Sequence, residues 1–194
     1  MARALLGGIL GGVAMWFIGF IFWGTPLNRL AFSVAPDSAN AAIQSTLAAQ
    51  LGPSGTGVYS VPWPGTQAGS YLYAQGPTAL IQFNTHGFAV VDSASLVGGL
   101  VLGIIAAVLV AFALRTVSTG LSFGGRLTLV GLFAIAIPAY TDLGQIVFNH
   151  APAGYFIYLF FSDMLAFLAA GAIIAWMLPN AAVEPVASYP PTEV

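Results

Sequence analysis

Two aspartates, Asp142 and Asp163, are the residues of this chain best placed to do chemistry, because each lies inside a long apolar segment. A carboxyl group in the hydrocarbon layer of a membrane costs about 3 kcal/mol or more, so such groups face protein or water and often mark a functional site. Burial and mutual repulsion both disfavour the charged form, so we expect at least one of the pair to be protonated at neutral pH unless a cation intervenes.

Two roles are open to this acidic pair. Gln145 lies one helical turn from Asp142, and Arg29 is the cation expected at the same membrane face. One role is a polar clasp between helices, in which Asp142 and Asp163 bond to each other, to Gln145 or to Arg29. The other is a proton or cation relay, or a polar ligand site open to one side. Apolar inner halves of the two segments argue against a two-sided pathway within one copy.

Other catalytic chemistry finds little support. The chain has no cysteine, which excludes disulfides, thiolate metal sites and cysteine nucleophiles. It has no G-x-S-x-G or H-E-x-x-H motif, and His86 and His150 lack the spacing of metal or haem ligands. We therefore predict a protein that is not an enzyme, with no catalytic residues, no metal and no cofactor.

The composition places the chain in a membrane. Of 194 residues, 58% are hydrophobic and 5% are charged, whereas a soluble domain carries about 25% charged residues. Such a chain cannot cover a surface that faces water. It has only four Lys and Arg residues, too few for a nucleic-acid-binding patch. Membrane lipids are the expected surroundings, and nucleic acid is not an expected partner.

Four segments approach or exceed the roughly 20 apolar residues that span a bilayer. They cover residues 4–23, 95–114, 127–148 and 155–178, and none contains Lys or Arg. The first is longer than the apolar region of a signal peptide, so we interpret it as an uncleaved anchor. The short loop between the last two predicts antiparallel neighbours, which brings Asp142 and Asp163 to matching depth.

The arginines predict the orientation. Arg3 precedes the first segment, and Arg115 and Arg126 bracket the loop between the second and the third. The positive-inside rule then puts both termini in the cytoplasm of a bacterium, with a multi-pass protein in its inner membrane. Residues 25–94 and the last short loop face the periplasm.

The exported stretch is predicted to form a small α+β cap. Asp37 begins a predicted helix that has Ile43, Leu47 and Leu51 on one face. Residues 57–65, 71–73 and 79–83 are strand candidates, which predicts a helix packed on a two- or three-stranded sheet. The aromatic residues of the cap form either a small core with an interfacial belt or a docking face for a partner protein; the partner-facing candidates are Tyr59, Trp63, Tyr71 and Tyr73.

Rows of small residues at i, i+4 spacing predict close helix packing, because they let backbones approach. The residues are Gly7, Gly8, Gly11, Gly12, Gly99, Gly103, Ala166 and Ala170. The packing is either within the bundle or against a partner, and the pattern does not decide between the two.

The order of these features resembles a group of uncharacterised proteobacterial four-span inner-membrane proteins with a small periplasmic cap. The resemblance is carried by the glycine-rich first segment, the external helix and the element Gly57-Val58-Tyr59-Ser60-Val61-Pro62-Trp63-Pro64. It implies a topology and no activity.

The predicted fold is an all-α integral membrane protein with four transmembrane helices and a small α+β extracytoplasmic insert between the first and second. The domain boundaries are residues 1–24 for the first helix, 25–94 for the cap, 95–178 for the remaining helices and 179–194 for a disordered cytoplasmic tail. The predicted function is a non-enzymatic accessory, assembly or stabilising subunit that packs against other integral membrane proteins or a second copy. The alternative is a small oligomeric transporter, or a proton- or cation-coupled component, that uses Asp142 and Asp163.

Overall fold

The computed structural model describes residues 1–179, so the tail predicted over 179–194 lies almost wholly outside the described residues. The chain divides into two compact units. One is helical and combines residues 1–33 with the chain from residue 93 onward, and the other comprises residues 34–92.

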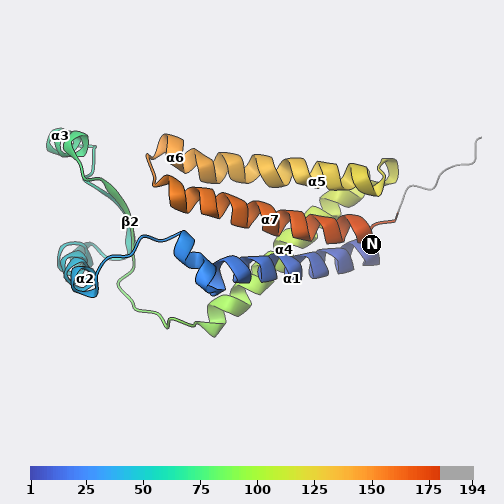
Figure 1. Cartoon of the computed structure of the whole chain (residues 1–194), viewed down its shortest axis with the longest axis horizontal. Helices are drawn as coiled ribbons and strands as arrows, with labels where there is room; N and C mark the ends of the chain where they lie inside the picture. Colours follow the sequence, from blue (N-terminus) through green and yellow to red (C-terminus); the bar gives the residue numbers. More distant parts are fainter. Residues whose placement is uncertain (180–194) are drawn as a thin grey trace, which may run out of the picture. The chain divides into compact units, whose positions relative to one another are not determined.

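Four long helical segments make up the helical unit (Figure 1). They are α1 (Ala2–Gly24), α4 (Ser93–Val117), α5 (Phe123–Pro138) continued by η4 (Ala139–Leu143) and α6 (Gly144–Phe148), and α7 (Ala153–Met177), with the short helices η1 (Pro26–Leu30) and η3 (Ser118–Gly120). All four segments are long and apolar enough to cross a membrane, which confirms the predicted number of candidate spans within the described residues. Each observed segment begins two to four residues before its predicted apolar run; the first two end one and three residues beyond it, and the last two end within one residue of it.

Three arginines lie within the long helices, just outside the predicted apolar runs: Arg3 in α1, Arg115 in α4 and Arg126 in α5. The apolar run begins at residue 127, whereas α5 starts at Phe123, where the Ser122 hydroxyl accepts a hydrogen bond from Gly125 N–H at 3.2 Å. The Arg126 side chain is 0% exposed and donates from Nη1 to the carbonyls of Leu178 (3.1 Å) and Pro179 (2.8 Å). The last carbonyls of a helix have no partner inside it, and Arg126 supplies donors at the end of α7.

Helix α1 packs against α4 on one face and against α7 on another. A Cβ atom added to Gly8 would lie 2.7 Å from Cα of Val108, and one added to Gly12 would lie 2.4 Å from Cα of Ile104. Because residue 8 meets residue 108 and residue 12 meets residue 104, α1 and α4 are antiparallel. Figure 1 shows α4 crossing α1 obliquely.

Gly7 and Gly11 of α1 face α7. A Cβ atom on Gly7 would lie 3.3 Å from Cβ of Met177, and one on Gly11 would lie 3.0 Å from the carbonyl oxygen of Ala170. Ala166 and Ala170 are both buried in α7. These small residues are therefore used for packing within the chain.

The predicted glycine row on α4 is used only in part. A Cβ atom on Gly103 would lie 3.3 Å from the carbonyl oxygen of Gly12, so this position is tight. At Gly99 the nearest atom, on Trp16, is 3.8 Å away, an ordinary contact. The bundle is completed by α5, which packs on α7 so closely that a Cβ on Gly171 would lie 2.0 Å from Cγ1 of Val130.

The second unit contains α2 (Asp37–Leu51), η2 (Gly52–Ser54), β1 (Gly57–Val61), α3 (Gln67–Gln75) and β2 (Ala79–Phe83). The two strands pair antiparallel, from Gly57 opposite Phe83 to Val61 opposite Ala79. The predicted helix from Asp37 and two of the predicted strands are present.

The predicted strand at residues 71–73 is wrong, because these residues lie in α3. The Thr66 hydroxyl accepts a hydrogen bond from Gly69 N–H at 3.0 Å and so starts a helix, and Gly76, with φ +68°, ends it. These two end signals outweigh the strand preference of Tyr71 and Tyr73.

The predicted packing of a helix on a sheet is also wrong. Helix α2 has no buried residue, and Ile43 on its expected apolar face is 54% exposed. Across residues 34–92 the one buried residue is Gly69, so this unit has regular secondary structure without a hydrophobic core.

The glycine contacts predict that Gly12→Ala lowers the stability of the helical unit by about 1–3 kcal/mol, the usual cost of overpacking, because the added methyl group would meet backbone atoms of α4. The control is Gly19→Ala on the same helix, which has nothing within 4 Å of the added Cβ and should leave stability nearly unchanged. Thermal unfolding of the two variants in mild detergent measures the difference. Equal melting temperatures would show that the α1–α4 contact is not this close.

Candidate functional site

The acidic pair lies where the third helical segment departs from α-helical geometry. Pro138 ends α5, and the next turn, η4, is a π-helix. Proline removes one backbone donor and clashes with the preceding turn, and π-turns inside helices often occur at functional sites. Asp142 lies on this turn and is 7% exposed.

The hydrogen bonding of Asp142 is incomplete. Its Oδ1 accepts a bond from the Thr141 hydroxyl at 3.0 Å, whereas its Oδ2 is buried and has no hydrogen-bond partner among the described residues. Asp163, half-buried on α7, lies close enough to Asp142 for the two carboxyl groups to interact electrostatically. The structure thus brings the two aspartates together and leaves one buried oxygen able to hold a proton or meet a cation.

The structure does not place Gln145 or Arg29, the other two residues of the predicted polar cluster, in contact with the aspartates. Gln145 donates from Nε2 to the Thr141 carbonyl at 3.3 Å, and its Oε1 accepts from Asn149 Nδ2 at 2.6 Å. Arg29 is exposed on η1 and forms no ion pair within residues 1–179. A clasp through Gln145 or Arg29 is therefore not formed.

Instead, an aromatic cluster that the sequence pattern did not predict connects α1 and α7 beside Asp163. Trp23 Nε1 donates to the Ser162 hydroxyl at 3.0 Å, and the Tyr158 hydroxyl donates to the Phe22 carbonyl at 2.6 Å. The Trp23 ring also lies 5.2 Å from the Tyr158 ring and 5.9 Å from the Tyr155 ring, centroid to centroid. The spacing of Tyr155, Tyr158 and Ser162 at i, i+3, i+7 on one helical face is the signal that could have found it.

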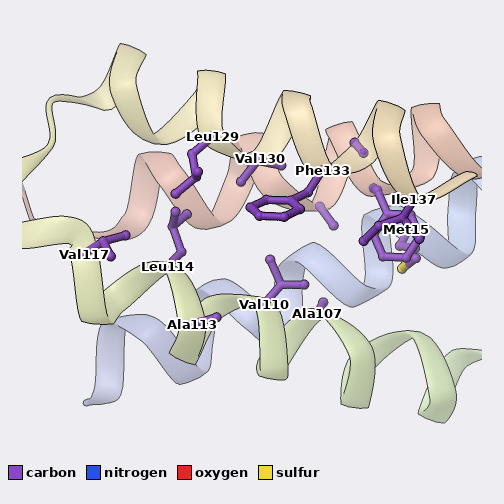
Figure 2. Close-up of a pocket in the computed structure, with 13 residues that line it drawn as sticks. Met15, Ala107, Val110, Ala113, Leu114, Val117, Leu129, Val130, Phe133 and Ile137 are labelled. Atoms are coloured by element: carbon purple, nitrogen blue, oxygen red, sulfur yellow. The ribbon is translucent and has the colours of Figure 1, made fainter. Parts of the chain in front are cut away.

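A cavity of about 320 Å³ lies between α1, α4, α5 and α7. Figure 2 shows side chains of α4, including Val110 and Leu114, facing side chains of α5, including Leu129 and Phe133. Every lining residue is apolar: Met15, Ala107, Val110, Ala113, Leu114, Val117, Leu129, Val130, Phe133, Ala134, Ile137, Phe167 and Ala170. The cavity can accommodate hydrocarbon, but it offers no group that could orient or transform a substrate.

The four partner-facing candidates of the second unit differ in exposure. Tyr59 is half-buried, donates to the Gly55 carbonyl at 2.7 Å and packs edge-on against Phe83. Tyr73 is also half-buried. Trp63 and Tyr71 are 65% and 66% exposed, so these two rings are open to a partner.

No group of three or more His, Cys, Asp or Glu residues within residues 1–179 is arranged to hold a metal ion. His86 and His150 are both exposed. Asp142 and Asp163 are therefore the strongest candidates for chemistry in the described part of the chain.

The chain matches no protein-family model, no curated protein and no solved structure. The resemblance to a proteobacterial inner-membrane group thus remains a prediction, and the function of the chain has to be inferred from its own geometry.

The aromatic cluster predicts that Trp23→Phe costs about 1 kcal/mol of stability, the usual net value of one hydrogen bond, because it removes the donor to the buried Ser162 hydroxyl. The control is Trp176→Phe, since that ring is 75% exposed. Chemical unfolding in detergent, followed by the fluorescence of the remaining tryptophans, compares the two. Equal loss in both variants would contradict a specific role for the Trp23–Ser162 bond.

Proposed function

We propose that this protein is a non-enzymatic accessory or assembly subunit that binds another integral membrane protein through residues 34–92. The observation that carries the proposal is the second unit itself. It has two helices and a paired sheet, yet it buries no hydrophobic side chain of its own.

A unit without a hydrophobic core gains stability when its apolar side chains are buried against another molecule. A single two-stranded sheet is at best marginally stable in water, and a small domain depends on a hydrophobic core. Here several large apolar side chains are exposed, among them Trp63 and Phe88, which is 72% exposed. Clusters of exposed large apolar side chains favour an interaction site.

Several features favour a protein partner over the lipid surface. Residues 34–92 contain no Lys or Arg, the side chains that attract anionic headgroups. The two strands form a sheet with two open edges, whose free N–H and C=O groups a protein can pair and hydrocarbon cannot. Exposed Trp and Tyr are also the residues that dominate protein interfaces. A second copy of this chain is the alternative partner.

The setting we propose is a bacterial inner membrane with both termini in the cytoplasm. Four candidate spans support a multi-pass protein. Arg115 contacts Met1, and Arg126 bonds to the end of α7, so three of the four arginines (Arg3, Arg115 and Arg126) lie at the end of the bundle that carries the beginning of α1, whereas Arg29 follows the other end of α1. The positive-inside rule assigns that end to the cytoplasm.

A second candidate function is a proton- or cation-coupled component, favoured by the unpartnered buried Oδ2 of Asp142 beside Asp163. A buried acid without a complete set of hydrogen bonds is costly to keep, which is expected where it exchanges a proton or a cation. The wholly apolar lining of the neighbouring cavity offers no continuation of a polar path, which ranks this candidate second.

The accessory role predicts that a partner recovered with the chain from native membranes is lost when the apolar surface is charged. We expect the double variant Trp63→Glu, Tyr71→Glu to lose at least about tenfold of the bound partner, because burying an unpaired charge is strongly unfavourable. The double variant Gln44→Glu, Gln50→Glu, at exposed polar positions of α2, is the charge-matched control and should retain the partner. Quantitative mass spectrometry after mild solubilisation gives the ratio. Recovery of this chain alone, as a monomer, would contradict the proposal.

The second candidate predicts that Asp142→Asn and Asp163→Asn each abolish proton or monovalent-cation flux in proteoliposomes while the melting temperature stays the same. Asp37→Asn, in the second unit, is the control and should leave any flux intact. A fall in melting temperature without any measurable wild-type flux would establish the acidic pair as purely structural.

A further inference from the structure

A second hollow, of about 610 Å³, lies in the helical unit where α1 begins and α4 ends. Arg3 and Arg115 both line it, together with Thr116, Ser118 and Thr119. We propose that this hollow binds a phosphate-bearing anion, supplied by the headgroup of an anionic phospholipid. The proposal is independent of the accessory role.

The positive charge of two guanidinium groups that line one hollow favours the binding of an anion. Arg3 and Arg115 form no ion pair with any carboxylate among residues 1–179. Of the two aspartates of the helical unit, Asp142 lies near the end of the third helical segment away from the hollow, and Asp163 lies near the middle of α7. No described carboxylate therefore neutralises the charge of Arg3 or Arg115, and the planar guanidinium matches phosphate oxygens with paired donors.

Further groups on the hollow favour a negative charge. The hydroxyls of Thr116 and Ser118 already donate to the carbonyls of Ala113 (2.6 Å) and Arg115 (2.9 Å). The Thr119 hydroxyl has no such bond among the described residues, so it remains available as a donor. The first turn of α1 has no side-chain cap, which leaves its backbone N–H groups at the same hollow.

The end of α7 also lines the hollow, and its carbonyl groups would repel an anion if they were free. Arg126 Nη1 donates to the carbonyls of both Leu178 and Pro179. Its charge offsets the negative end of the α7 dipole and adds to the positive potential of the site.

A lipid is the expected source because the hollow has an apolar part beside its cationic part. Phe112 and Leu178 contribute to the lining, and the hollow lies at the ends of candidate membrane spans, the level at which headgroups occur. Arginines near a membrane surface each strengthen binding to anionic lipid several-fold.

The experiment is native mass spectrometry of the full-length protein, delipidated in mild detergent and titrated with phosphatidylglycerol. We expect Arg3→Gln and Arg115→Gln each to reduce the phosphatidylglycerol adduct about fivefold, the effect of one arginine near a headgroup. Arg29→Gln is the matched control, since Arg29 is exposed on η1 and does not line the hollow. The charge-preserving variants Arg3→Lys and Arg115→Lys should retain more of the adduct than the Gln variants, which separates lost charge from lost folding.

Three outcomes would overturn the proposal. Equal adducts for the wild type and both Gln variants would remove the assignment to Arg3 and Arg115. Equal retention of phosphatidylcholine, which carries no net charge, would show that negative charge is not recognised. Displacement of phosphatidylglycerol by millimolar inorganic phosphate would assign the site to free phosphate, and persistence of the adduct supports the lipid.

Discussion

Gly8 and Gly12 on one face of α1, and Gly7 and Gly11 on another, allow the backbones of two neighbouring helices to approach closer than any side chain would permit. In a bilayer there is little hydrophobic drive to bring helices together, so van der Waals contact between close backbones is a main source of association. Helix α1 thus holds α4 and α7 on its two sides, and α5 adds to the outer face of α7. The basic hollow, lined by residues of α1 and α4, depends on this arrangement, and the acidic pair depends on the packing of the third helical segment against α7.

Charge is separated along the helical unit. The buried Asp142 and its neighbour Asp163 lie in one half, and Arg3, Arg115 and Arg126 gather at the opposite end. A bundle that crosses a bilayer in this way presents three of its four arginines at one membrane face and keeps Asp142 inside protein, away from lipid. This separation gives one candidate chemistry to each half: proton or cation exchange at the acids and anion binding at the arginines.

The second unit shows a different kind of dependence. Its helices and strands are defined by local signals such as the Thr66 cap, but these signals provide no core. Local structure without burial leaves the apolar rings of Trp63 and Tyr71 exposed, at a cost in free energy that burial against another surface would remove. The absence of Lys and Arg from this unit favours a protein surface over a lipid surface as that partner.

The amino-acid sequence by itself determined the four apolar segments, because the length of an apolar run and its freedom from charge are local properties. It also indicated that the glycines of α1 pack closely and that the two aspartates are neighbours, since short loops force antiparallel pairs. Only the tertiary structure decided that the two glycine rows face different helices, that the π-turn after Pro138 carries a buried Asp142, and that Arg126 reaches the end of α7. These outcomes depend on how helices rotate and cross, and that is set by contacts between residues far apart in the chain.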